Sequence, residues 1–149
     1  MGTKRVGLAR VEALVENLKR ELALSTAVLR AQGFQPITTA VTATDTGAAI
    51  PDGAQFVTVD ADSDANHIVI LPTPTPGTTV ILVETGTTGY ELRSSTPASV
   101  AINGGTGGTA ESAIAGAITY VRCVCISPTA WIASQYDADG DESKVEAAS

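Results

Sequence analysis

The chain has 149 residues, a net charge of −7, 44% hydrophobic residues and only 4% aromatic residues. A chain of this length buries enough apolar surface to fold without disulfides or metals, so we expect one domain with appendages. The 20 threonines, 14 glycines and few aromatic rings indicate a β-rich protein with an aliphatic core, and they argue against a deep ligand pocket or a base-stacking platform.

The first predicted element is an amphipathic helix from about Arg10 to Arg30, ended by Gly33. Its apolar residues recur near the helical period, and its charged residues lie on the other side. This stripe needs a partner, which is a sheet of the same chain, copies of the helix itself, or a larger assembly into which the helix docks. The heptad pattern lasts only about one and a half heptads, so a long coiled coil is not expected. The stripe consists of Val11, Leu14, Val15, Leu18, Leu22 and Leu29.

Charge is divided unevenly along the chain. Residues 1–30 hold six Lys or Arg and three Glu, whereas residues 31–149 hold three Lys or Arg and 13 Asp or Glu. The basic residues Lys4, Arg5 and Arg10 mark either a solvated helix end or a contact for an acidic surface. An acidic body repels phosphate backbones, so no nucleic-acid partner is expected. No apolar run is long enough for a secretory signal or a membrane span, so we expect a soluble protein made in a cytoplasm, without a membrane partner.

Four regions are predicted from the changes in composition. Residues 1–33 form the basic arm and helix, residues 34–53 a Thr/Ala/Gly-rich connector, residues 54–136 a β-domain, and residues 137–149 an acidic disordered tail. Within the connector, Ile37–Thr44 alternates enough to be an extended segment or a first strand.

The β-domain alternates short apolar segments with clusters of Gly, Pro, Asn and Asp about every ten residues, which is typical of an antiparallel β-sandwich or barrel. No helical segment separates the strands, so parallel βαβ units are excluded. The predicted fold is therefore mainly β, preceded by one N-terminal amphipathic α-helix. The predicted strands are Phe56–Asp60, His67–Leu71, Thr79–Glu84, Tyr90–Ser94, Val100–Ile102, Ile118–Ile126 and Trp131–Tyr136.

The predicted core is aliphatic. Cys123 and Cys125 point to the same face of their strand, so we expect buried apolar residues there and neither a disulfide nor a zinc site. The core residues are predicted to be Phe56, Val57, Val59, Ile68, Ile70, Val80, Leu82, Leu92, Ile102, Ile118, Val121, Val124, Ile126 and Ile132.

No segment carries the spacing of a known catalytic or cofactor site. The Gly-rich segment Asn103–Thr109 does not match a P-loop or a dinucleotide-binding turn, so a flexible loop is expected. A short helical turn is predicted within Ala110–Ala117. His67 is the only histidine and no nucleophile motif occurs, so we expect no catalytic residue, no metal, no cofactor and no small-molecule substrate.

The N-terminal pattern Lys4–Val6 followed by Val11–Glu21 resembles the opening of small structural proteins of tailed bacteriophages, notably marine and cyanobacterial phages. In the body, Asn66–Pro72, Pro76–Val80 and the Ile102–Gly104 turn, with a late Ser-Pro-x-x-Trp131, are similar to the β-domains of phage capsid decoration (cement) and fibre-like proteins. The body also resembles β-domains that decorate capsids as trimers over local three-fold positions.

The resemblance implies a homotrimeric capsid decoration protein, made in the host cytoplasm and located on the outer capsid surface of the virion. Its partners would be itself and the major capsid protein, and it would stabilise contacts between capsomers. An alternative is a trimeric tail-fibre or receptor-binding module that recognises host glycans through loops such as Gly86–Gly89 or Asn103–Thr109, although the few aromatic residues count against it. A small enzyme would need a site assembled between subunits. The predicted oligomer and capsid contacts are Val11, Leu14, Val15, Leu18, Leu22, Leu29, Lys4, Arg5 and Arg10.

Overall fold

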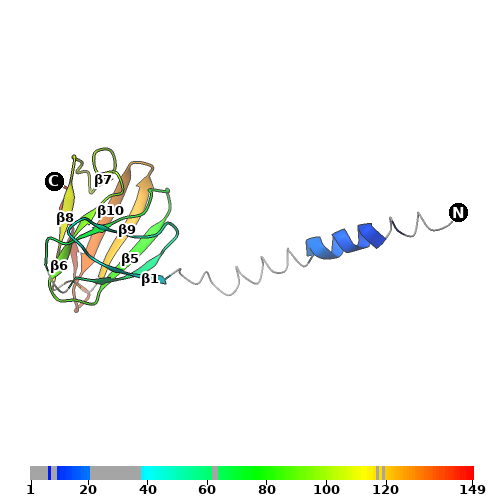
Figure 1. The fold of residues 1–149 in the computed structure, drawn as a ribbon, viewed down its shortest axis with the longest axis horizontal. Coiled ribbons are helices and arrows are strands. Elements are labelled where there is room, and N and C mark those ends of the chain that lie inside the picture. Colours follow the sequence, from blue (N-terminus) through cyan, green and yellow to red (C-terminus); the bar gives the residue numbers. More distant parts are fainter. Residues whose placement is uncertain (1–6, 8–9, 21–37, 62–63, 117, 119) are drawn as a thin grey trace. The chain divides into compact units, whose positions relative to one another are not determined.

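The computed structural model describes residues 7, 10–20, 38–61, 64–116, 118 and 120–149. The chain divides into two compact units, Met1–Gln35 and Pro36–Ser149. In the first unit residues 10–20 are helical (Figure 1), which confirms the N-terminal helix over that range. The predicted continuation to Arg30 and the stop at Gly33 lie outside the described residues.

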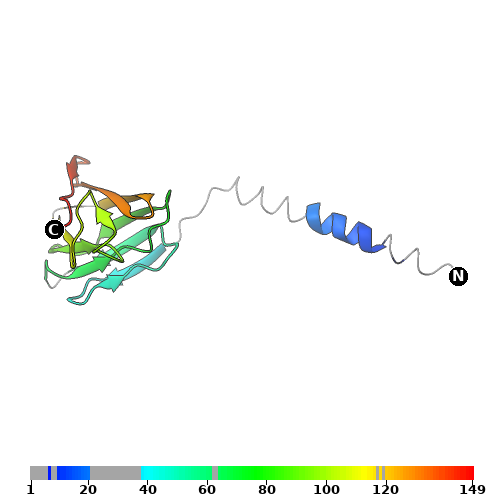
Figure 2. The ribbon, with the colours of Figure 1, turned by 90° about the horizontal axis from the view of Figure 1, so that it is seen from above.

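The second unit consists of two sheets that enclose one hydrophobic core (Figures 1 and 2). Sheet A has the strand order β1 (Thr38–Thr42), β3 (Phe56–Asp60), β5 (Thr79–Glu84), β9 (Tyr120–Ser127), β10 (Ala130–Tyr136) and β11 (Glu142–Lys144), and β7 (Ala101–Ile102) also pairs with β10. Sheet B has the order β2 (Ala48–Ala49), β4 (Ile68–Ile70), β6 (Gly89–Arg93) and β8 (Glu111–Ala115).

From β1 to β6 the chain alternates between the two sheets, with odd strands in sheet A and even strands in sheet B. Neighbouring strands in this part are therefore parallel, as in β1–β3, β3–β5, β2–β4 and β4–β6. A parallel pair needs a crossover connection, and here a strand of the opposite sheet supplies it in place of a helix. The mainly β, sandwich-like fold of short strands is confirmed.

The predicted antiparallel pairing of neighbouring strands is confirmed only for β5–β9, β9–β10, β10–β11 and β6–β8. It is wrong for the pairs from β1 to β6, and also for β7–β10, which is parallel. No helices connect the described strands, so βαβ units are excluded, as predicted. Parallel strands still form, because consecutive strands lie alternately in the two sheets.

The core lies between the sheets, and its largest members are Trp131, Tyr90, Leu71 and Leu82. Eight of the predicted core residues are buried: Val57, Val59, Ile68, Val80, Leu82, Leu92, Ile102 and Val121. Phe56, Ile70, Ile118 and Val124 are half-buried, while Ile126 and Ile132 are exposed, which corrects their assignment to the core. The reason is the two-residue period of a strand, since Val121, Cys123 and Cys125 fill the inward positions of β9 and Trp131 and Ala133 those of β10.

The domain boundaries differ from the prediction at both ends of the β-domain. The described part of the predicted connector 34–53, residues 38–53, contains β1 and β2, and its residues Ala43 and Ile50 are buried, so this part belongs to the sandwich. The predicted disordered tail 137–149 contains β11, and its apolar residues Val145 and Ala148 are buried in the core. The segment predicted as a helical turn is β8, because Ser112 and Ile114 alternate inward at the period of a strand.

The Gly-rich segment that was predicted as a flexible loop begins with a structural joint. Strands β7 and β11 pair with the same edge of β10 at different positions, and the Asn103 side chain fills the gap between them. Asn103 Oδ1 accepts a hydrogen bond from the Ala133 amide at 2.9 Å, and Asn103 Nδ2 donates to the carbonyls of Ala133 at 2.9 Å and Val145 at 2.7 Å. The Asn103 backbone has φ 51°, a left-handed conformation that asparagine tolerates. Asn103 thus acts as a substitute strand partner.

Candidate functional site

The helix stripe is exposed over the described residues. Four of the six predicted stripe residues fall within the described part of the chain. The exposed fractions of their side chains are 56% for Val11, 68% for Leu14, 44% for Val15 and 63% for Leu18. Arg10 is also exposed at the start of this helix. The other predicted contacts, Leu22, Leu29, Lys4 and Arg5, lie outside the described residues.

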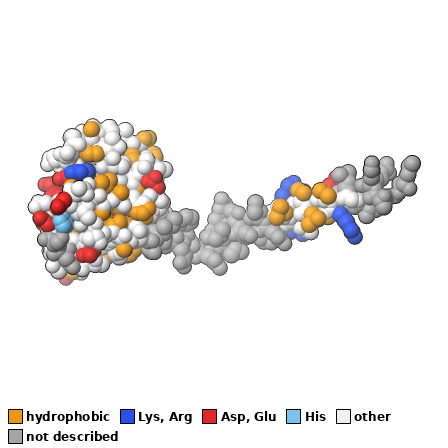
Figure 3. All heavy atoms as spheres, in the orientation of Figure 1, with side chains coloured by type: hydrophobic (Ala, Val, Ile, Leu, Met, Phe, Trp, Pro, Cys, Tyr) orange, Lys and Arg blue, Asp and Glu red, His pale blue; other side chains and the backbone are white. Residues whose placement is uncertain are grey.

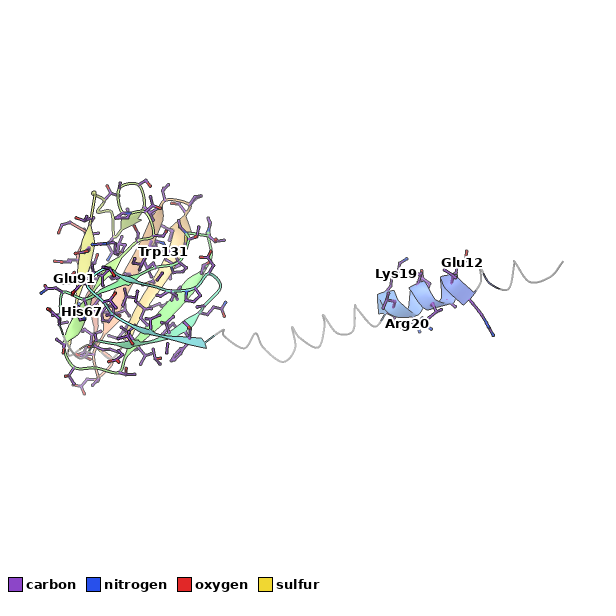
Figure 4. The ribbon with its side chains drawn as sticks, viewed as in Figure 1. Glu12, Lys19, Arg20, His67, Glu91 and Trp131 are labelled. Carbon is purple, nitrogen blue, oxygen red and sulfur yellow. The ribbon has the colours of Figure 1, made fainter. Side chains whose placement is uncertain are left out.

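The polar side of the same helix carries charges of both signs. Figure 4 shows Glu12, Lys19 and Arg20 projecting from it. Lys19 Nζ lies 3.2 Å from Glu16 Oε1, an exposed ion pair that contributes little to stability. Taken by itself, the described helix therefore has an exposed apolar stripe on one side and charges of both signs on the other.

A second exposed apolar surface lies on sheet A, on the side that faces away from the core. We call it the outer face of sheet A, and it contains Ile126 and Ile132, which are the most exposed large aliphatic residues among those described in the second unit, at 57% and 43%. Figure 3 shows hydrophobic side chains gathered on the second unit. The strand register places the following residues on this face: Phe56, Thr58, Asp60, Thr79, Ile81, Val83, Tyr120, Arg122, Val124, Ile126, Ile132, Ser134, Tyr136, Glu142 and Lys144.

Polar groups on the outer face of sheet A are arranged in rows across the strands. Arg122 of β9 pairs in register with Ser134 of β10, which pairs with Lys144 of β11. The next row contains Tyr120 and Tyr136, whose rings stack with centroids 4.5 Å apart and planes 12° apart. Among the described residues Arg122 makes no ion pair. The face therefore combines aliphatic side chains with an arginine that makes no ion pair among the described residues, while Glu142 lies in the neighbouring row.

The outer face of sheet B has the opposite character. Arg93 is paired with Glu111 across β6 and β8. Burial raises the pKa of the nearby Glu91 carboxyl, and the negative charges of Glu111 and Glu146 raise it further. Carboxylates thus outnumber cations on this face, and the two outer faces of the sandwich differ in chemistry.

His67 lies beside this acidic face and is the one candidate for acid–base chemistry. Its Nε2 is 3.0 Å from Asp45 Oδ1, and its carbonyl accepts a hydrogen bond from the Glu91 amide at 2.8 Å. Figure 4 labels His67 and Glu91 next to one another; His67 directly precedes β4, and Glu91 lies in β6. In the part of the chain that the structure describes, no group of three His, Cys, Asp or Glu residues is arranged to hold a metal.

The two cysteines are buried on one face of β9, as predicted. Burial raises the pKa of the Cys123 thiol to about 12, so thiolate is scarce at neutral pH. The Cys125 thiol donates to the Ser127 carbonyl at 3.1 Å. Both residues are therefore parts of the core and not reactive groups.

No protein-family model, curated protein or solved structure matches this chain. Within the described segments, no helix has the length and apolar content needed to cross a membrane. The functional argument therefore depends on the surfaces themselves.

Sequence reasoning missed the outer face of sheet A because it assigned Ile126 and Ile132 to the core. A signal was present in the run from Val121 to Ile126, where apolar residues occupy both inward and outward positions of one strand. A strand with two apolar faces is typical of a sheet that is covered on both sides.

Proposed function

We propose that this chain is a structural virion protein, a homotrimeric decoration protein that binds the outer surface of a tailed-phage capsid and stabilises contacts between capsomers. The observation that carries the proposal is the presence of two exposed apolar surfaces, the helix stripe and the outer face of sheet A. Exposed apolar patches of this kind mark protein–protein contacts. The choice of partner rests on the resemblance of the segments Lys4–Val6 and Val11–Glu21 to the opening of tailed-phage structural proteins.

The chemistry of the chain suits a protein that adheres without catalysing a reaction. The helix stripe provides a contact between copies, since several such stripes bury one another when helices associate. Linking three copies multiplies modest contacts with a shell, because the second and third contacts form at a high effective concentration. The acidic body disfavours nonspecific association.

Two measurements test the proposal. Light scattering after size exclusion is expected to give three times the 15.1 kDa mass of one chain, and a Leu14→Ser/Leu18→Ser variant is expected to give a lower mass. The unchanged protein is expected to bind empty, undecorated shells of its phage at micromolar concentration. A failure to bind such shells would refute the decoration role whatever the mass.

A trimeric receptor-binding module is the second candidate, and one observation favours it. The stacked pair Tyr120 and Tyr136 offers aromatic rings on a sheet surface, and sugar rings pack well on such groups. Against it, the Asn103 amide in one of the predicted binding loops is committed to Ala133 and Val145. Specific binding on a glycan array, combined with no binding to shells, would favour this second function.

A further inference from the structure

We propose that the outer face of sheet A is the surface that docks onto the shell, and that it recognises a protein surface of aliphatic side chains with carboxylates opposite Arg122 and Lys144. This inference rests on the proposed function and specifies the contact within it. The acidic outer face of sheet B then remains toward solvent.

The first argument is the apolar content of the face. A sandwich needs one apolar face on each sheet, and sheet A already has an inner face that includes Val80, Leu82 and Trp131. Its outer face adds Ile126 and Ile132, which are largely exposed, and Ile81, Val83 and Val124, which are half-buried. A second apolar face on the same sheet is unfavourable in water unless another surface covers it.

The second argument is the distribution of positive charge. Only three Lys and Arg residues follow residue 35, and two of them, Arg122 and Lys144, lie in one row across β9, β10 and β11. The third, Arg93, is already paired with Glu111 on sheet B. On the outer face of sheet A, Glu142 accepts a hydrogen bond from the Tyr136 hydroxyl. Arg122 therefore remains available for a carboxylate of a partner.

The same charges argue against a second copy of this chain as the partner. Two identical faces related by a two-fold axis would bring two copies of Arg122 and Lys144 onto one interface, where the carboxylates are Glu142, which already accepts a hydrogen bond from Tyr136, and Asp60, which lies two strands away from β9 on β3. Contact of this face with the acidic face of another copy would join opposite sides of two sandwiches. Repetition of that contact gives an open-ended stack and not a closed trimer. A different protein can place carboxylates opposite Arg122. Docking on that protein also stops further copies of this chain from stacking on the face.

A groove continues the face on the side of β11. It has a volume of about 470 Å³, and Ile132 and Ser134 line one part of it while Glu142, Ser143 and Lys144 line another. Its wall combines aliphatic, hydroxyl and charged groups, which suits a single polar side chain with an apolar stem. The groove therefore adds a shaped contact to an otherwise flat sheet.

The test compares variants for binding to empty shells assembled from the major capsid protein of the phage. The Arg122→Glu variant reverses the central charge, and the Ile126→Thr/Ile132→Thr variant makes the face polar while keeping β-branched residues in the strands. The matched control is Glu91→Gln on the outer face of sheet B. We expect at least a tenfold rise in the dissociation constant for the first two proteins and less than a twofold change for the control.

Mass and folding are measured on the same proteins. The mass by light scattering and the circular dichroism spectrum are expected to match the unchanged protein, because all these side chains point away from the core. Equal shell binding by all variants would refute this face as the contact and leave the proposed function intact. A lower mass for either variant of sheet A would show that the face joins copies, which overturns the assignment to the shell. Absence of binding by the unchanged protein would overturn both proposals.

Discussion

Replacing Asn103 by alanine is the most informative test of how this sandwich is held together. The substitution removes an amide that makes three hydrogen bonds, one from the Ala133 amide and two to the carbonyls of Ala133 and Val145. It leaves the ends of β7 and β11 without their link on the edge of β10. The affected groups lie in the second unit, so its unfolding reports the effect.

The expected loss in the free energy of unfolding follows from the three hydrogen bonds and from the left-handed backbone of Asn103. Each hydrogen bond contributes about 0.5–1.5 kcal/mol, and the exposed part of the site lets water replace some of the loss. The left-handed backbone of Asn103, with φ 51°, adds about 1 kcal/mol when alanine occupies the position. We therefore expect a loss of about 3 kcal/mol in the free energy of unfolding. For a unit of this size that loss lowers Tm by roughly 12 °C.

Urea unfolding followed by circular dichroism measures this change, with an unchanged m-value expected. Two further variants separate the causes. Asn103→Gly removes the amide but accepts the left-handed backbone, so it is expected to recover about 1 kcal/mol relative to alanine. Asn66→Ala is the matched control, because its side chain makes an exposed hydrogen bond to Asp64 at 2.9 Å. An Asn103→Ala protein that unfolds at the same urea concentration as the Asn66→Ala control would contradict the role of the joint.

Three other experiments test the core and the acidic outer face of sheet B. The Tyr90 hydroxyl is buried without a hydrogen-bond partner among the described residues, so Tyr90→Phe is expected to keep or raise Tm by calorimetry, and a fall of several degrees would contradict this. Because burial raises the pKa of Cys123 to about 12, its thiol is expected to react with a maleimide at pH 8 only after unfolding, which a time course with and without denaturant measures. Glu91 has a raised pKa in the fold, so its ionisation destabilises the native state as pH rises through that pKa. Glu91→Gln is therefore expected to raise Tm at pH 7 and to lose this advantage at a pH below the carboxyl pKa of the unfolded chain, whereas an equal gain at both pH values would refute the cause.

Local sequence predicted the elements that carry a strong local signal. The predicted bounds of Phe56–Asp60 and Thr79–Glu84 match β3 and β5, because alternating β-branched residues there end at turn-forming residues. The helix over residues 10–20 is equally local, since its stripe is visible in the spacing of Val11, Leu14, Val15 and Leu18.

The elements that were missed depend on distant partners. Strand β2 contains only Ala48 and Ala49, which favour no particular structure and become a strand by pairing with Val69 and Ile70. Strand β11 is the polar segment Glu142–Lys144, which pairs with β10 while the following Val145 enters the core. Parallel pairing has no local signal either, because it follows from the passage of the chain between two sheets.

The candidate site was predicted only in part, for a related reason. Hydrophobicity identified Ile126 and Ile132 as residues that need cover, but it did not show whether the cover is the core or another molecule. Their strand positions decide this, because Cys125 and Trp131 already occupy the neighbouring inward positions. Residues that look like core in the sequence and lie outside in the fold are therefore the best indication of a contact surface in this chain.

The two exposed apolar surfaces also bear on how tight the proposed attachment needs to be. A single outer face with a few exposed aliphatic residues and one available arginine suits a modest contact, with a dissociation constant of the order of 10 μM or about −7 kcal/mol, which lies about 100-fold below a millimolar effective concentration. Three such faces linked in a trimer bind in steps that follow at effective concentrations of the order of millimolar. Weak individual contacts then give strong attachment of the trimer, while a monomer remains free to dissociate and rebind. In the proposed assembly, the helix stripe sets the number of contacts with the shell, and the outer face of sheet A sets the strength of each contact.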